Sequence, residues 1–400
     1  MRIVTSLSLL CLASIAACSG ESPEAGSTSS PPTDPPDVGC VADAECSASP
    51  EAPLCDVATG ACSPLPAGHP IGWRDGSPGS VDLVSLYEPD KVRIPTDLAF
   101  NPAKPTEMWV VNRQDDSVII IQNPGTPDIA WEHRRDPAAS HFMDRPTALA
   151  FGVESEHYGM AWATCGDNNN HESDFTGPSL FSADLDIFAM ETPGGLGSHL
   201  DMLHSTSFCK GIAHEAENIY WVFNGDRGAI DKYDFGHDHG PGNDDHADGK
   251  IYRYVNSMLA GADGVSSHVF YNHDDKHLYI ADTGNKRVVK LDSQSGTMGS
   301  SFSGQEPVIE RRRVNGAVLT DVVPPGVLES PSGLEIHDNL IYVTDVATSR
   351  FYAFDMAGQL VRTLDTGLPP GSLSGLVFGP DEKVYFADML SSRIYRIDPK

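Results

Sequence analysis

The sequence predicts an all-β fold over residues 80–400, in which six similar small sheets close into a ring. Six segments share one plan: an apolar strand after a turn, a second strand ending near Asp or Asn, and a third strand of alternating residues. Alternation of apolar and polar residues between Gly, Pro, Asn and Asp is typical of half-buried strands. No window carries a helical period of comparable strength. Because one small sheet cannot cover both of its faces, a closed ring of sheets is the stable arrangement.

The six repeats follow one another along the chain, and each begins at a turn. They start at Pro95, Pro146, Cys209, Ser266, Pro331 and Leu373. The last repeat supplies only three strands before the chain reaches Lys400. Residues 81–88 (VDLVSLYE) precede the first repeat. We expect this segment to complete the last sheet and so to close the ring.

The fourth repeat contains the stretch YIADTGNKRVVKLD, which resembles an NHL repeat. The resemblance extends over nearly all of residues 80–400. It implies a six-bladed β-propeller with four strands per blade around a central channel. In such a fold, loops between the second and third strands lie on the top face, where the inner strands begin. Loops between the first and second strands, or between the third and fourth, lie on the bottom face.

The N-terminus has the pattern of an export signal. Arg2 precedes an apolar stretch, Val4–Ala13, that is too short to span a bilayer. Three small or apolar residues then lead to Cys18, and this ending resembles a bacterial lipobox. The resemblance implies a signal peptide over residues 1–17 and lipid chains on Cys18; an ordinary signal peptide cleaved beside Cys18 is the alternative. We therefore expect an exported protein that is lipid-anchored at the bacterial cell envelope. The serine after Cys18 is compatible with onward transport to the outer membrane or cell surface.

Two short segments separate this signal from the repeats. Residues 18–39 hold mainly Ser, Pro, Gly, Glu and Asp, and we expect a lipid-anchored, disordered linker. Residues 40–64 contain four cysteines: Cys40, Cys46, Cys55 and Cys62. An exported segment with so few apolar residues needs covalent cross-links, and the spacing lacks the close pairs of zinc ribbons. We predict a small disulfide-rich segment, with three pairings open.

The charge excludes several classes of partner. The chain has 27 Lys and Arg against 56 Asp and Glu, a formal net charge of −29. Nucleic acids and anionic lipid surfaces need a cationic face, so neither is an expected ligand of the folded domain. The 40% of hydrophobic residues is enough for a large core and excludes disorder throughout. We expect a monomer whose contact with the membrane is the N-terminal lipid.

Cys165 and Cys209 are the remaining cysteines of the repeats. The first ends the second strand of blade 2, and the second begins the inner strand of blade 3. The fold therefore places both near the top of adjacent blades. Because an exported protein meets an oxidising compartment, we predict a disulfide; a thiol pair that binds copper or carries redox chemistry is the alternative.

Histidines suggest a metal site, since nine of the 15 lie between residues 199 and 277. The loop of residues 236–249 combines glycines with imidazole and carboxylate groups, which supply ligands for a divalent ion. The candidate ligands are His239, Asp244, His246 and Asp248, and zinc, copper and calcium are the candidate ions. The run ending at Asp248 begins like an EF-hand, but Val255 stands where that loop needs Glu. Imidazole suits zinc or copper better than calcium. A solvated polar loop is the alternative.

A second set of residues points to a ligand pocket at the top of the channel. The candidates are His268, Asp97, Lys210, Asp226, Arg227 and Asp282. The aspartates at strand ends have a structural alternative as turn caps. Because a strand of about five residues spans roughly 17 Å, we expect this pocket and the bottom-face loop to be separate sites, unless the long loop folds back along the channel. His204, in the long insertion of blade 2, is expected at the top.

These patterns favour a metal-binding propeller that holds a small-molecule or peptide ligand at its top face. The exported peptide-amidating lyase is a similar propeller, and the resemblance implies a metal-dependent lyase or hydrolase as an alternative. That family holds zinc with three channel-facing histidines, whereas here His268 alone has such a position, so its triad is not reproduced. A non-catalytic scaffold for protein–protein interaction is the second alternative. The catalytic residues of any enzyme activity are not identified by the sequence.

Overall fold

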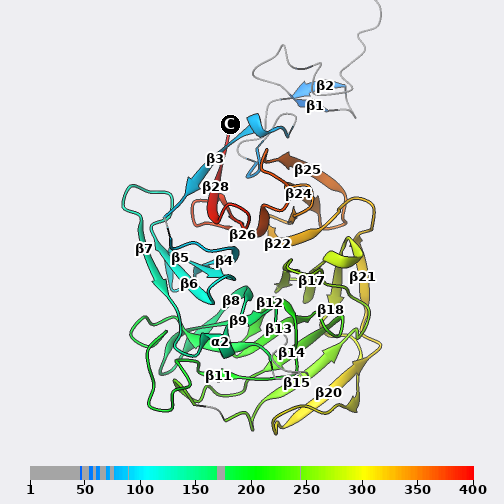
Figure 1. Cartoon of the computed structure of the whole chain (residues 1–400). Helices are drawn as coiled ribbons and strands as arrows, with labels where there is room; N and C mark the ends of the chain where they lie inside the picture. The colour runs from blue at the N-terminus through cyan, green and yellow to red at the C-terminus, as the bar shows by residue number, and fades with distance from the viewer. Residues whose placement is uncertain are drawn as a thin grey trace, which may run out of the picture.

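The computed structural model describes residues 46, 54–56, 60–63, 69–72, 76–88, 90–168, 176–243 and 245–400. Within these residues the chain forms the six-bladed β-propeller that the repeats predict (Figure 1). The signal peptide, Cys18, the linker and Cys40 lie outside the described residues. No helix in the described ranges is long and apolar enough to cross a membrane.

The first three blades follow the chain in order, each starting with its inner strand. Blade 1 contains β4 (Pro95–Asn101), β5 (Lys104–Asn112), β6 (Ser117–Gln122) and β7 (Ala130–Arg134). Blade 2 contains β8 (Pro146–Ser155), β9 (Gly159–Gly166), β10 (Ser179–Ser182) and β11 (Asp201–Met202). Blade 3 contains β12 (Cys209–Ala216), β13 (Ile219–Asn224), β14 (Ala229–Asp234) and β15 (Lys250–Tyr254).

The last three blades complete the ring. Blade 4 contains β16 (Val269–Asn272), β17 (His277–Asp282), β18 (Arg287–Asp292) and β21 (Leu319–Val323). Blade 5 contains β22 (Pro331–His337), β23 (Leu340–Asp345), β24 (Arg350–Asp355) and β25 (Leu360–Asp365). Blade 6 contains β26 (Leu373–Phe378), β27 (Val384–Asp388), β28 (Arg393–Pro399) and β3 (Val81–Leu86).

The closing strand lies where the sequence predicts it. β3 pairs antiparallel with β28, with Leu86 opposite Ile394 and Val81 opposite Pro399. Both ends of the propeller therefore meet in one sheet, and blade 6 has the same four strands as the others. The inner strands contact one another around the whole ring, from β4 through β26 and back to β4.

Hydroxyl groups tie neighbouring inner strands together. Thr96 donates a hydrogen bond to the Pro146 carbonyl (2.8 Å), Thr147 donates to the Cys209 carbonyl (3.1 Å), and Ser374 donates to the Thr96 carbonyl (2.6 Å). These side chains are fully buried. Because each bond crosses from one blade to another, the ring is held around the channel by polar contacts as well as by apolar packing.

Four features of the fold are additions to the repeat. A hairpin of β19 (Thr297–Ser301) and β20 (Glu310–Asn315) extends blade 3, with β20 parallel to β15. A short helix, α2 (Ala139–Phe142), precedes blade 2, and the 3-10 turn η1 (Pro78–Ser80) precedes β3. In the predicted Cys-rich segment, β1 (Leu54–Asp56) pairs with β2 (Ala61–Ser63), and a disulfide joins Cys46 to Cys62.

Candidate functional site

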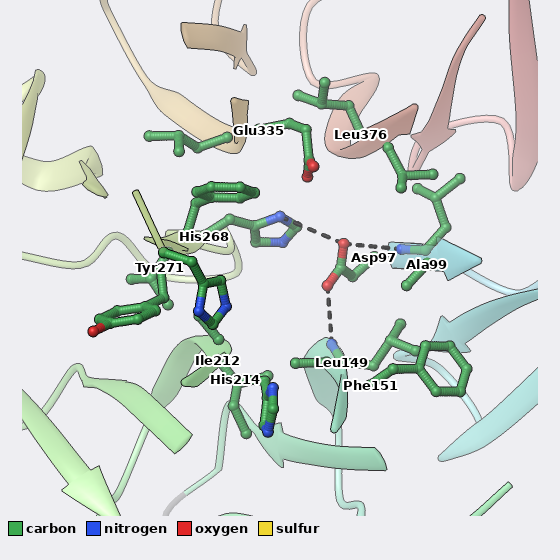
Figure 2. A pocket seen from close by; sticks show the side chains of 18 residues that line it. Asp97, Ala99, Leu149, Phe151, Ile212, His214, His268, Tyr271, Glu335 and Leu376 are labelled. Atoms are coloured by element: carbon green, nitrogen blue, oxygen red, sulfur yellow. Dashed lines mark hydrogen bonds and ion pairs between the residues drawn. The ribbon is translucent and has the colours of Figure 1, made fainter. Parts of the chain in front are cut away.

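The inner strands of all six blades surround a cavity of about 290 Å³ in the central channel (Figure 2). Most of its wall is apolar and includes Leu149, Phe151, Ile212, Leu334 and Leu376. The polar residues on the wall are fewer: Asp97, Glu335, His214, His268 and His273, together with Tyr271, whose hydroxyl lies 3.4 Å from that of Ser293. None of the described residues that line this cavity is Lys or Arg. The wall therefore carries two carboxyl groups and no permanent positive charge.

Asp97 and His268 face each other across the channel. Nδ1 of His268 lies 3.5 Å from Oδ1 of Asp97, and both side chains are almost fully buried. Asp97 also accepts hydrogen bonds from the backbone N–H groups of Leu98 and Leu149, each at 2.9 Å. Burial raises the pKa of Asp97, while the imidazole of His268 and the two N–H donors oppose that rise. Nε2 of His268 is buried and has no hydrogen-bond partner among the described residues.

Glycine at position 375 makes room for this pair. A Cβ atom there would lie 2.5 Å from Oδ1 of Asp97 and 2.7 Å from Cε1 of His268. Both distances are well below van der Waals contact, so any side chain would displace one of the two groups. The contribution of β26 to the site is therefore the space beside Gly375, which Asp97 and His268 occupy. This role of Gly375 was not predicted from the sequence.

Glu335 on β22 is the second carboxyl group of the channel. Figure 2 shows its side chain directed into the cavity, toward the space between His268 and Asp97. Burial raises the pKa of Glu335 to about 8, and the nearby charge of Asp97 adds to this. The side chain is partly exposed and lines the channel cavity. Glu335 was not among the predicted site residues, although its place two residues after Gly333 on an alternating strand indicates a side chain that faces the channel.

The other predicted pocket residues do not line the cavity. Lys210 is buried and binds Oδ1 of Asp167 (2.7 Å) and the Ala262 carbonyl (3.0 Å). Asp282 accepts hydrogen bonds from Arg287 (2.7 Å) and from the Ala260 N–H (2.8 Å), so it acts as the turn-capping residue given as its alternative. Asp226 and Arg227 pair with each other at the surface (3.1 Å). Of the six predicted residues, the structure brings together Asp97 and His268.

A second polar cluster lies between blades 2 and 3. The loop from β14 to β15 packs on the segment before β11: the His239 N–H donates to the Leu200 carbonyl (3.1 Å), and the Gly242 N–H donates to the His199 carbonyl (2.8 Å). These contacts bring His239 and Asp248 to Asp201, a fully buried residue of β11. We call Asp201, His239 and Asp248 the rim cluster.

The rim cluster has the spacing of a metal site. Nε2 of His239 lies 3.2 Å from Oδ1 of Asp248 and 3.8 Å from Oδ2 of Asp201, and one ligand atom from each residue fits within 4.8 Å of the others. Ligands of a tetrahedral ion with bonds of about 2.1 Å are about 3.4 Å apart, close to these distances. Burial raises the pKa of Asp201 to about 6, while His246 and His239 oppose the rise. Oδ2 of Asp201 has no hydrogen-bond partner among the described residues.

His246 extends this cluster on one side. Its Nδ1 lies 3.4 Å from Oδ1 of Asp201, and its ring meets that of His204 at 5.5 Å between centroids. The expectation that His204 and this loop lie at opposite faces is therefore wrong, because the loop folds back onto the insertion of blade 2. Asp244, the fourth predicted ligand, lies outside the described residues. Asp201 was missing from the predicted set. The sequence did indicate that Asp201 and His199 share one face of a strand, with Leu200 on the other face.

Cys165 and Cys209 form a disulfide between β9 and β12. Their Cα atoms are 5.8 Å apart, and both residues are buried. This is the pairing that the repeat alignment predicts, and it links blades 2 and 3 beside the channel.

Comparisons with known proteins support the fold. No protein-family model and no curated protein matches the chain. Among solved structures, an auxiliary nutrient-binding protein from Bacteroides ovatus is 12% identical, covers 80% of this chain and 73% of its own, and has a TM-score of 0.51. A luciferin-regenerating enzyme is 11% identical, covers 80% and 95%, and has a TM-score of 0.49. A catalytically inactive virginiamycin B lyase from Staphylococcus aureus, with quinupristin, is 12% identical, covers 80% and 88%, and has a TM-score of 0.46.

The sheet topology defines the chain as a six-bladed β-propeller of the kind that the NHL-like repeats predict, and the nutrient-binding protein is similar to it in fold. At such low identity they concern the fold alone. The function has to be argued from the channel and the rim cluster.

Proposed function

We propose that this protein is an exported β-propeller that binds a divalent transition-metal ion at the rim cluster. One observation carries the proposal: a fully buried carboxylate, Asp201, has an unpartnered oxygen directed at an imidazole and a second carboxylate from another blade. Oδ1 of Asp201 accepts the Met202 N–H at 2.6 Å, but a buried carboxylate oxygen that lacks a donor, as Oδ2 does, is costly unless a cation compensates it. The ion would join two blades, so its binding would stabilise the packing of the loop on β11.

The ligand types favour zinc or copper over calcium. Asp201, His239 and Asp248 offer one nitrogen and two carboxylate groups, and His246 stands beside them as a further nitrogen donor. Imidazole with carboxylate suits zinc and copper, whereas calcium takes six to eight oxygen ligands. Asp248 is also held in place, because its Oδ2 accepts the His237 N–H at 2.8 Å. A ligand that is oriented by its own neighbours binds a metal more tightly.

Elemental mass spectrometry on the purified full chain tests this proposal. We expect about one zinc or copper per chain, and loss of that metal in an Asp201→Asn/His239→Ala double variant. His237→Ala is the matched control, since His237 is an exposed imidazole of the same loop and its contact to Asp248 uses only the backbone. Equal metal content in all three proteins, or no metal in any, would contradict the proposal.

Anchoring at the cell envelope is the second part of the proposed function. It is supported by the lipobox-like ending at Cys18, by the polar linker that follows, and by disulfides that require an oxidising compartment. The lipid would hold the propeller beside the membrane, with its strongly acidic surface facing solvent.

The channel favours a second function, the holding of a small-molecule or peptide ligand. The observation behind it is the cavity of about 290 Å³ with an unpartnered, buried Nε2 of His268 on its wall. Small-molecule sites are typically concave and apolar with a few convergent polar groups.

A metal-dependent lyase or hydrolase that acts in the channel is the less favoured alternative. Among the described residues, three metal-binding side chains converge within 4.8 Å at the rim cluster and at no other place. A protein–protein scaffold would not need an enclosed polar group of this kind.

A further inference from the structure

The channel cavity has an unbalanced set of polar groups. Asp97 and Glu335 each present a carboxyl group to it, and its wall contains no Lys or Arg among the described residues. Asp97 has backbone donors and His268 beside it. Glu335 receives no hydrogen bond and no ion pair from the described residues. In a cavity with mostly apolar walls, such a carboxyl group is stable either when it holds a proton or when a cation enters.

His268 adds a third acceptor. Its Nδ1 lies 3.5 Å from Oδ1 of Asp97, so a proton carried on Nδ1 would face that carboxylate and leave Nε2 able to accept a hydrogen bond. That Nε2 is buried and has no hydrogen-bond partner in the described part of the chain. Figure 2 shows the ring of His268 and both carboxyl groups facing one space. The cavity therefore offers three hydrogen-bond acceptors and lacks a donor for two of them.

We propose that the channel binds a small organic ammonium ion with a short apolar tail. The ammonium group has three N–H donors and one positive charge. It would donate to Asp97, Glu335 and Nε2 of His268, while its tail would lie against Leu149, Leu334 and Leu376. This inference rests on the ligand-holding function proposed for the channel and names the class of that ligand.

The geometry favours an organic cation over a bare metal ion. A metal ion needs its ligand atoms within a few ångströms of one another. In the described ranges the channel residues do not meet that condition, and the rim cluster does. The cavity is also larger than one ion needs, and its apolar wall offers an ion no ligands.

Binding should be linked to the release of a proton. Burial raises the pKa of Glu335 to about 8, so this carboxyl group is mostly protonated at pH 7, and an ammonium ion would favour its ionised form. The other titratable groups on the cavity wall are Asp97, Tyr271 and three histidines: His214, His268 and His273. Burial lowers the pKa of His214, so this imidazole is neutral at pH 7 and adds no competing charge.

Isothermal titration calorimetry of the full chain with n-butylammonium tests the inference. We expect saturable binding and a release of protons that is larger at pH 7 than at pH 9, measured from heats in buffers with different ionisation enthalpies. Glu335→Gln should weaken binding about tenfold or more and abolish the proton release. Glu329→Gln is the matched control, because Glu329 is an exposed acid of the loop before the same blade. Its binding should equal that of the unaltered chain. Circular dichroism should confirm that both variants are folded.

Two neutral or anionic analogues separate the possible failures. If n-butanol or butyrate binds as tightly as n-butylammonium, and Glu335→Gln has no effect, the channel holds ligands but the ammonium class is wrong. If none of the three compounds binds to a folded chain, the ammonium inference and the ligand-holding function of the channel both fail.

Discussion

Six residues occupy equivalent positions, the third place of each inner strand segment, at one level of the channel. They are Asp97, Ala148, Gly211, His268, Gly333 and Gly375. Four of the six have little or no side chain, so Asp97 and His268 can cross the channel and meet. Glycine and alanine at these positions thus shape the site, because they leave the space that the two larger side chains occupy.

The first prediction concerns Gly375. A Gly375→Ala variant should be destabilised by about 1–3 kcal/mol, because its Cβ would overlap Asp97 and His268. Urea denaturation measures this change. Gly194→Ala is the control, since its added Cβ would lie 3.7 Å from its nearest neighbour, the Gly242 carbonyl oxygen, an ordinary van der Waals contact. Equal stability of the two variants would mean that the Asp97–His268 pair relaxes without cost.

The second prediction concerns the pH dependence of stability. Burial and the charge of Asp97 raise the pKa of Glu335 to about 8 in the folded protein, from its ordinary value of 4.5. Between these values the folded state binds a proton that the unfolded state releases, so this group lowers the free energy of unfolding as pH rises. The slope is at most about 1.4 kcal/mol per pH unit. Unfolding curves at pH 5, 6.5 and 8 should show that the free energy of unfolding of Glu335→Gln increases relative to that of the unaltered chain as pH rises. A constant difference would show that Glu335 is ionised in the folded protein.

At the scale of elements, the joints of the ring were predicted more accurately than its insertions. β3 closes blade 6, and Cys165 meets Cys209, because both follow from the repeat alignment. The hairpin β19–β20, which joins blade 3 by a parallel pair, follows no repeat and was not predicted. The loop between β14 and β15 was predicted as a metal loop, but its contact with Asp201 depends on a segment about 40 residues away.

The third prediction concerns the disulfide between blades 2 and 3. Replacing Cys165 and Cys209 by Ala should lower the free energy of unfolding by about 2–4 kcal/mol, since the bridge restricts the unfolded chain. Denaturation monitored by Trp fluorescence checks this, as Trp162 and Trp221 lie in the adjacent blades. Replacing Cys46 and Cys62 instead removes a disulfide outside the propeller and should leave that transition in place. A larger effect from the second pair would contradict the prediction.

At the scale of the whole molecule, the sequence predicts an acidic body on a long polar linker. The formal net charge of −29 makes direct adsorption to anionic lipid unfavourable. A stable association with a membrane would therefore depend on the lipid that we propose at Cys18.

The fourth prediction follows from this dependence. In a bacterial host that processes lipoproteins, the chain should appear in the membrane fraction, and Cys18→Ser should move it to the soluble fraction. Intact mass spectrometry should find lipid on the unaltered chain only. A soluble, unlipidated chain with Cys18 present would indicate an ordinary signal peptide instead.

The sequence by itself determined the blade architecture, the closing strand and the Cys165–Cys209 bridge. Alternation and repeat spacing record locally which residues are buried, and equivalent positions in a repeat fall at equivalent places in the ring. It also identified His268 and Asp97 by their places on inner strands.

Only the tertiary structure decided which polar residues meet. Glu335 joins Asp97 because two distant inner strands border one cavity, and Asp201 joins His239 because a loop folds onto a neighbouring blade. Lys210 and Asp282 do not line the predicted pocket, because their side chains bind Asp167 and Arg287 instead. Such contacts arise between residues far apart in the chain, where no local period records them.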